Sequence, residues 1–185
     1  WSWNAALAFV CGDVCIWKPS SKVPLSAIAT HKIIAEVFKA NNVPEGVSSL
    51  MVSHSSIGEE LAKDKRVPLL SVTGSTRVGK RVGAIVGERL GRVIQELGGN
   101  NAIIISEHAN MDIAIRAAVF GAVGTAGQRC TTTRRLIIHE KVYDDVIARL
   151  KKTYAQLRIG NPLDENNHVG PLIDTKAVDD YNAAI

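Results

Sequence analysis

Short runs of apolar, often β-branched residues alternate along the chain with longer segments in which apolar residues recur every three or four positions. The short runs predict buried strands, and the longer periodic segments predict amphipathic helices. The strand-like runs lie at 14–17, 49–52, 69–72, 92–97, 102–105 and 136–138. Such alternation is typical of βαβ units. We therefore predict an α/β fold, with a doubly wound, mostly parallel sheet and helices on both faces.

The helical segments carry their apolar residues on one predicted face each. Leu25, Ala29, Ile33 and Val37 recur every four residues and predict a buried helix face that ends near residue 41. A short helix is expected over 56–62. The other stripes use residues 78, 82, 85 and 86; residues 111, 115, 119 and 123, with Asn110 as the N-cap; and residues 142, 146, 150, 154 and 157. The segment 160–171, rich in Gly, Asn and Pro, predicts an extended loop.

Composition narrows the class of protein. The chain has 185 residues, a formal net charge of +4 and 5% aromatic residues. Its basic residues are dispersed at helical spacing without interleaved aromatic rings, which argues against a nucleic-acid partner and favours a solvated helix face. No apolar run approaches the ~18 residues of a membrane span, so we expect no membrane partner.

Cysteine usage and the first residues indicate the setting of the chain. Three cysteines are too few for a disulfide framework in a chain of this length, so we expect a reducing, cytoplasmic environment. Cys11 and Cys15 lie in or beside the first apolar run, where core packing is the expected role.

The five histidines do not cluster, and we expect no metal site. The chain begins without Met or a basic leader, so we expect a fragment of a longer protein.

Polar residues that follow predicted strands are the first candidates for a site, because ligands of open parallel sheets bind at the carboxyl ends of the strands. The run from Gly74 to Lys80 has the spacing G-x-x-x-x-G-K of a nucleotide phosphate loop. Arg81 replaces the Ser or Thr that would hold magnesium, which disfavours a nucleoside triphosphatase. Backbone amides and the Ser75 hydroxyl at a helix N-terminus can bind a phosphate without metal. A plain tight turn is the alternative.

Cys130 lies in a polar loop between a predicted helix and a predicted strand, next to Arg129. A neighbouring cation and free backbone amides favour the thiolate, which is the nucleophilic form of cysteine. The loop therefore makes Cys130 a candidate nucleophile. The alternative is a small apolar residue without a chemical role.

Glu96 ends a predicted strand and is followed by Gly98 and Gly99, which allow the backbone to turn closely around a ligand. Its apolar neighbours lead us to expect a desolvated carboxylate, the environment that tunes a general acid or base. A helix-capping or salt-bridged glutamate is the alternative.

Three ordered motifs, TGSTRVG at 73–79, ELGGN at 96–100 and GQRC at 127–130, resemble those of the aldehyde dehydrogenase superfamily. The resemblance extends over essentially the whole chain. Within the superfamily, NNAII at 100–104 and GTAGQRCTT at 124–132 are most similar to the α-aminoadipic semialdehyde dehydrogenase (antiquitin) branch.

The resemblance implies a reaction. Cys130 would attack the aldehyde carbon, and the adduct would lose hydride to NAD or NADP and leave a thioester, which water activated by Glu96 would hydrolyse. The substrate would be a small aldehyde, of the acidic semialdehyde type in the antiquitin branch. Arg129 and Thr131 would lie near it, and Arg129 could pair with its carboxylate. The full-length protein would be a homo-oligomer, a dimer or a tetramer.

The resemblance also implies cofactor contacts. The pyrophosphate would lie at the helix that Gly74 and Ser75 begin. The remaining implied cofactor residues are Lys18 and Ser21 near the adenosine ribose, Gly58 and Glu59 by the adenine, Gly79 in the phosphate motif, and Leu97 facing the nicotinamide. Ser21 replaces a glutamate that many NAD-preferring relatives carry, which opens the choice between NAD and NADP.

The resemblance also implies a division into domains and leaves two alternative functions. Residues 1–97 would be the later part of a dinucleotide-binding domain, and residues 98–185 the first part of a catalytic domain. A coenzyme-A-acylating relative is the alternative within enzymes, and Glu96 argues against it because that branch generally lacks the hydrolytic base. A non-catalytic, crystallin-like protein of the same fold is the alternative outside enzymes.

Overall fold

The computed structural model describes residues 1–185. The chain divides into two compact units, Trp1–Glu96 and Leu97–Ile185. This division falls one residue before the domain boundary that the sequence predicts. The assignment of the two parts as dinucleotide-binding and catalytic domains stays a prediction.

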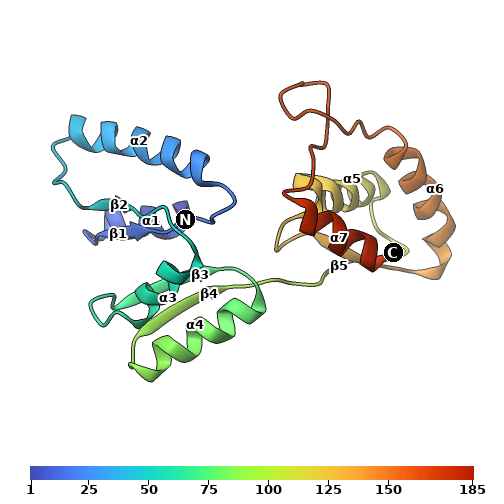
Figure 1. The fold of residues 1–185 in the computed structure, drawn as a ribbon. Helices are drawn as coiled ribbons and strands as arrows, with labels where there is room; N and C mark the ends of the chain where they lie inside the picture. Colours follow the sequence, from blue (N-terminus) through green and yellow to red (C-terminus); the bar gives the residue numbers. More distant parts are fainter. The chain divides into compact units, whose positions relative to one another are not determined.

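The first unit alternates helices with short parallel strands (Figure 1). Its strands pair in parallel as β1 with β2 and β3 with β4. The elements are α1 (Ser2–Val10), β1 (Cys15–Trp17), α2 (Pro24–Ala40), β2 (Ser48–Leu50), α3 (Ser55–Lys63), β3 (Leu69–Thr73), α4 (Thr76–Glu88) and β4 (Arg92–Glu96). Its best-buried apolar cluster consists of Ala62 from α3 with Val82 and Val86 from α4.

The second unit is built on one further parallel pair, β5 with β6. Its elements are β5 (Asn101–Ile105), α5 (Met111–Val123), the 3₁₀ turn η1 (Gly124–Gly127), β6 (Thr133–Ile138), the 3₁₀ turn η2 (Glu140–Val142), α6 (Tyr143–Tyr154) and α7 (Thr175–Ala184). Ile105, Ile115, Val119 and Val146 form the centre of its core. The α/β class and the parallel pairing are thereby confirmed.

Helix α5 begins as the sequence predicts. The Asn110 side chain accepts hydrogen bonds from the backbone N–H groups of Asp112 and Ile113, at 3.1 and 3.2 Å. These bonds satisfy two of the amides that a helix N-terminus leaves without partners. The predicted apolar stripe of α5 is also confirmed, because Ile115 and Val119 are each 7% exposed.

Helix α2 has the predicted length but not the predicted inner face. The predicted stripe is exposed: Leu25 by 79%, Ile33 by 63% and Val37 by 52%. The inner stripe instead contains Ala27, which is buried, and His31, whose Nε2 lies 3.1 Å from the Ser48 carbonyl oxygen of β2. A second apolar stripe with a histidine in it therefore packs against the sheet.

Two other expectations need correction or completion. The first strand is not fully buried, since Ile16 is 49% exposed. The residues 160–171 form the predicted loop, and an isolated parallel bridge between Ile159 and Val169 closes it. Helices α1 and α7 have no counterpart in the elements predicted from the sequence.

Candidate functional site

The turn between β3 and α4 presents free backbone donors. Ser75 is the N-cap of α4, and its Oγ accepts a hydrogen bond from the Val78 N–H at 3.3 Å. The amides of Thr76 and Arg77 in the first turn have no acceptor in the structure. Because a helix N-terminus carries a partial positive charge, these donors make the turn a place for a phosphate. Because the Ser75 oxygen only accepts in this cap, its own O–H can still donate to a phosphate, the role that the sequence predicts for it.

Glu96 lies beside that turn in the first unit. The parallel register pairs Thr73 with Glu96, and the Gly74 N–H donates to the Glu96 carbonyl oxygen at 3.0 Å. The two strand ends are therefore neighbours at the carboxyl edge of the β3–β4 pair. The side chain of Glu96 is exposed, so the desolvation expected from its apolar neighbours is absent in this structure. The reason within the first unit is that Glu96 is the last residue of β4, at the end of a two-stranded pair.

Residues implied as adenosine contacts meet around α3. The Lys18 side chain follows β1, and its Cδ lies 3.6 Å from the position that a Cβ of Gly58 would take. Next to it on α3, the Glu59 carboxylate accepts a two-pronged set of hydrogen bonds from Arg81, at 2.8–3.0 Å. Since Arg81 lies on α4, these contacts connect the end of β1 with α3 and with the helix of the phosphate turn. Ser21 is exposed in the turn after Lys18.

The ion pair between Glu59 and Arg81 gives a structural role to Arg81, the residue that replaces the Ser or Thr of a nucleotide phosphate loop. Hydrogen bonds from Arg81, and then from Lys63, hold the pKa of Glu59 below its ordinary value. A guanidinium engaged with a carboxylate takes the place where a metal-binding hydroxyl would stand. The structure thus agrees with the sequence in disfavouring a metal-dependent phosphate loop.

Gly79 has a packing role in the first unit. It is buried within α4, and its carbonyl oxygen accepts a hydrogen bond from the Gln95 side chain of β4 at 2.9 Å. This bond ties the helix of the phosphate turn to the strand that ends at Glu96.

Cys130 lies in the second unit, in the predicted loop between α5 and β6, and its side chain is exposed. The backbone before it turns with left-handed angles, with φ of 55° at Thr125, 53° at Ala126 and 70° at Gly127. Such angles are uncommon outside glycine. The loop is therefore a locally strained connection that ends in an accessible thiol.

Hydrogen bonds close the chain around Cys130. The Arg129 N–H donates to the Thr132 Oγ1 at 3.0 Å, and the Thr132 N–H donates back to the Arg129 carbonyl oxygen at 3.2 Å. The side-chain amide of Asn101 donates to the carbonyl oxygens of Cys130, at 2.7 Å, and Thr132, at 3.1 Å. Sequence reasoning assigned no role to Asn101 or Thr132. The Asn101 contacts span about thirty positions and leave no periodic signal, whereas the Thr132 contact with Arg129 spans three positions and could have been found as a local turn.

The segment 97–99, which contains Gly98 and Gly99 and is called the linker below, also reaches the Cys130 loop. A Cβ placed on Gly99 would lie 3.2 Å from the Cys130 carbonyl oxygen and 3.0 Å from the Asn101 Oδ1. Leu97 is half-buried at the start of the second unit. The segment that follows Glu96 in the sequence therefore lies directly against the loop of Cys130.

Arg129 and Thr131 flank the thiol. The Arg129 Nε donates to the Thr125 Oγ1 at 2.7 Å, and its guanidinium lies 5.8 Å from the centre of the Phe120 ring. Its two terminal nitrogens have no acceptor in the structure, so they remain available to a carboxylate. Thr131 is exposed next to Cys130.

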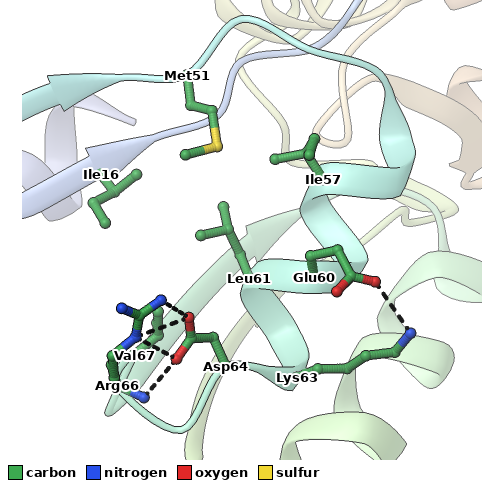
Figure 2. A pocket seen from close by; sticks show the side chains of 9 residues that line it. All are labelled: Ile16, Met51, Ile57, Glu60, Leu61, Lys63, Asp64, Arg66 and Val67. Carbon is green, nitrogen blue, oxygen red and sulfur yellow. Dashed lines mark hydrogen bonds and ion pairs between the residues drawn. The ribbon is translucent and has the colours of Figure 1, made fainter.

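A cavity of 660 Å³ in the first unit does not coincide with these residues (Figure 2). Figure 2 shows Met51 and Ile57 facing it together with Leu61 of α3. Its charged side chains are paired, with Arg66 on Asp64 and Lys63 on Glu60. It contains none of the predicted site residues. No group of three or more His, Cys, Asp or Glu side chains could hold a metal ion, and no helix is both long and apolar enough to cross a bilayer.

Comparison with known proteins gives a consistent result. Residues 1–185 match the sequence profile described as the aldehyde dehydrogenase family. The chain is 50% identical over 185 residues to the alpha-aminoadipic semialdehyde dehydrogenase of Bos taurus, and the match covers 100% of the chain and 34% of that protein.

Solved structures are also similar. Betaine aldehyde dehydrogenase from Staphylococcus aureus, in complex with NAD+, matches with a TM-score of 0.91 and 28% identity, over 99% of this chain and 36% of that one. Glyceraldehyde-3-phosphate dehydrogenase from Methanocaldococcus jannaschii, complexed with NADP, matches with a TM-score of 0.87 and 34% identity, over 93% and 38%. The chain spans about a third of the length of these relatives.

Proposed function

The chain belongs to the aldehyde dehydrogenase family, and from this premise we propose that the protein containing it oxidises an aldehyde to the carboxylate, with NAD or NADP as hydride acceptor. Cys130 is the proposed nucleophile and Glu96 the proposed base of the hydrolytic step. The substrate class is an acidic semialdehyde such as α-aminoadipic semialdehyde. The half-identical bovine relative that bears this name supports that choice.

The donor groups of the first unit fit a dinucleotide. Free amides at the start of α4 suit a pyrophosphate, and the Lys18 side chain beside Gly58 supplies a cation near the proposed adenosine site. A bound nicotinamide would accept the hydride. Relatives complexed with NAD+ and with NADP both support a nicotinamide cofactor. Ser21 carries no charge that would repel a 2′-phosphate, so the proposal includes both cofactors.

The position of the linker 97–99 is the observation that carries the proposal. At its start, the Glu96 carbonyl oxygen accepts the N–H of Gly74 from the phosphate turn. At its end, Gly99 lies against the Cys130 carbonyl oxygen. Because consecutive Cα atoms are 3.8 Å apart, the Cα atoms of Glu96 and Gly99 are separated by at most ~11 Å. The proposed base thus precedes by three residues the glycine that lies against the loop of the proposed nucleophile.

The proposed steps use the residues of this chain in order. The Cys130 thiolate adds to the aldehyde carbon, and its sulfur becomes bonded to a tetrahedral carbon whose oxygen carries the negative charge. As the carbonyl re-forms, the hydrogen on that carbon leaves as hydride, which makes a thioester. Glu96 then takes a proton from water, whose oxygen attacks the thioester and displaces the thiolate as the carboxylic acid forms.

Substitution of the two proposed catalytic residues tests these steps separately. In the full-length protein, Cys130→Ala should abolish aldehyde-dependent reduction of the cofactor, measured by absorbance at the start of the reaction. Glu96→Gln should still form the thioester and should release the product slowly, because the amide cannot accept the proton. A stopped-flow trace of this variant should show a fast burst followed by a slow steady rate.

Two results would reject the assignments. Normal turnover of Cys130→Ala would remove the thiol from the mechanism. Normal steady turnover of Glu96→Gln, without accumulated thioester, would remove the carboxylate. Cys11→Ala is a matched control, since Cys11 is also exposed and has no proposed chemical role.

Parallel rate measurements test the substrate and the cofactor. The full-length protein is assayed with NAD and NADP against α-aminoadipic semialdehyde, betaine aldehyde and a simple aliphatic aldehyde. The proposal expects the largest kcat/KM for the acidic semialdehyde, because the free end of Arg129 can bind its carboxylate. A preference for the aliphatic aldehyde would reject the semialdehyde assignment and leave aldehyde oxidation in place.

A further inference from the structure

The Asn101 side chain makes two hydrogen bonds to the loop of the proposed nucleophile. Asn101 is the first residue of β5 and pairs with Thr133 of β6. The ladder then shifts register, so that Ala102 pairs with Arg135. From this point the Asn101 Nδ2 reaches the Cys130 carbonyl oxygen at 2.7 Å and the Thr132 carbonyl oxygen at 3.1 Å. Both protons of the amide group are therefore used on one short turn.

Thr132 closes the same turn from inside the protein. It is 5% exposed and is the single polar side chain in the buried set. Its Oγ1 accepts the Arg129 N–H at 3.0 Å, while its own N–H donates to the Arg129 carbonyl oxygen at 3.2 Å. A buried hydroxyl without a partner would be costly, so this pairing keeps the turn closed. Cys130 and Thr131 are left as its two outer residues.

These bonds also fix the direction of two backbone donors. A trans peptide group is planar, so its N–H points opposite to its C=O, and the chain contains no cis peptide. Fixing the Arg129 carbonyl therefore directs the Cys130 N–H, and fixing the Cys130 carbonyl directs the Thr131 N–H. Neither of these two amides has an acceptor in the structure, and both residues are exposed.

We propose that Asn101 is a positioning residue for Cys130. Its amide, together with the Thr132 hydroxyl, holds the turn 129–132 so that the thiolate and the two free amides face the same incoming carbonyl. The thiolate then meets the aldehyde carbon while the amides face the oxygen that becomes negative. This inference rests on the proposed function, in which Cys130 is the nucleophile.

Asn101→Asp in the full-length protein is the direct test. The variant has the same shape but places an acceptor against two carbonyl oxygens. In the first single turnover after the enzyme is mixed with an excess of a simple aliphatic aldehyde and of NAD or NADP, the rate of hydride transfer should fall ~10–100-fold, the loss typical of misplaced reacting groups and lost oxyanion donors. The amplitude, which counts folded and competent enzyme, should equal that of the wild type. The KM for the cofactor should also stay at the wild-type value.

Asn100→Asp is the matched control. Asn100 precedes Asn101 directly and is exposed, and only its backbone carbonyl accepts a hydrogen bond, from Arg135. The substitution makes the same change of charge one residue away. It should therefore leave the single-turnover rate unchanged. An equal loss in both variants would show that charge near the loop, and not the Asn101 hydrogen bonds, sets the rate, and would overturn the proposal.

A second pair of variants decides the matter if Asn101→Asp does not fold. Thr132→Val keeps the shape and burial of the side chain and removes the acceptor of the Arg129 N–H, so the single-turnover rate should fall ~10-fold or more. Thr132→Ser restores the hydroxyl and should restore most of that rate. Failure of the serine to restore it would overturn the proposal.

The outcomes separate this inference from the function on which it rests. Inactive Cys130→Ala with an unchanged single-turnover rate in Asn101→Asp would reject the positioning role alone. A reduced amplitude at an unchanged rate would mean that Asn101 only stabilises the fold, and would reject it too. Active Cys130→Ala would reject the proposed function itself.

Discussion

Ala126 has a side chain where the backbone angles favour glycine. Its φ of 53° follows the 55° of Thr125 and precedes the 70° of Gly127. A left-handed residue with a Cβ costs roughly 1–2 kcal/mol. The Arg129–Thr125 hydrogen bond and the closed turn 129–132 offset this cost in the folded chain. These hydrogen bonds therefore stabilise a strained backbone conformation in the loop of the proposed nucleophile.

Ala126→Gly should stabilise the protein. The relief of roughly 1–2 kcal/mol of strain exceeds the ~0.5–1 kcal/mol of chain entropy that an added glycine costs. We expect an increase of up to ~1 kcal/mol in the free energy of unfolding, measured by urea titration. Ala117→Gly, on the exposed face of α5, should lower it by ~1 kcal/mol. The same sign for both variants would contradict the strain at Ala126.

The candidate site divides at this scale into residues that a sequence reveals and residues that it hides. Gly74, Glu96 and Cys130 follow strands or precede them, so strand prediction alone directs attention to them. Asn101 reaches the Cys130 loop from the neighbouring strand, and no pattern of nearby residues in the sequence predicts such a hydrogen bond. The exposure of Glu96 was equally hidden, because burial depends on which elements cover a strand end.

The helices show the same division at the scale of elements. Those with one apolar stripe and a polar remainder, such as α6, bury the predicted face, since Val146 and Leu150 are buried. Helix α2 has two apolar stripes, and the longer aliphatic side chains favoured the wrong one. In the structure Phe38 of the inner stripe packs edge-on against Phe9 of α1, with ring centres 5.1 Å apart. Helix α1 is thus one of the elements that determine which face of α2 is buried, and α1 was not predicted from the sequence.

The missed helices lack a clear period. Helix α1 is apolar on nearly all positions, so periodicity could not distinguish it from a strand. Helix α7 did carry a usable signal, because Asp174 caps it by accepting the Ala177 N–H at 2.9 Å. An acidic N-cap before a short polar helix is weak evidence without a stripe behind it.

The N-cap of α5 supplies a prediction at this scale. Asn110→Ala removes the acceptor of two backbone amides and should lower the free energy of unfolding by ~1 kcal/mol, within a range of 0.5–2 kcal/mol. Asn110→Asp keeps the acceptor and should retain most of the stability. Urea titration of both variants beside the wild type measures the difference. If the two variants lose equal stability, the cap is not what Asn110 contributes.

The chain as a whole exposes much apolar surface. The outer stripe of α2, defined by Leu25, Ile33 and Val37, is the most regular part of it. With the exposed Ala29 between Leu25 and Ile33, these side chains repeat every four residues along one helix face, whereas scattered exposed residues are ordinary. This strip should therefore govern how the 185-residue chain behaves in water.

Replacing all three residues of the α2 outer stripe with Gln should lower the fluorescence of a bound hydrophobic dye and raise the solubility of the 185-residue chain. The helix content measured by circular dichroism should stay the same, because these side chains are each more than half exposed and Gln is a good helix former. Leu163→Gln is the control, since Leu163 is 89% exposed but stands alone in a loop. A loss of helix content in the triple variant would mean that the stripe is packed in solution.

The room left by Gly99 has a consequence for genetic variation. Even the smallest side chain there would press on the backbone oxygen of Cys130 and on the oxygen of the Asn101 amide. In a saturation library scored for growth that requires the enzyme's activity, position 99 should tolerate glycine and little else. Position 99 would then rank among the sites where substitutions abolish activity, although no atom of Gly99 takes part in the chemistry. Its contribution is the absence of a side chain.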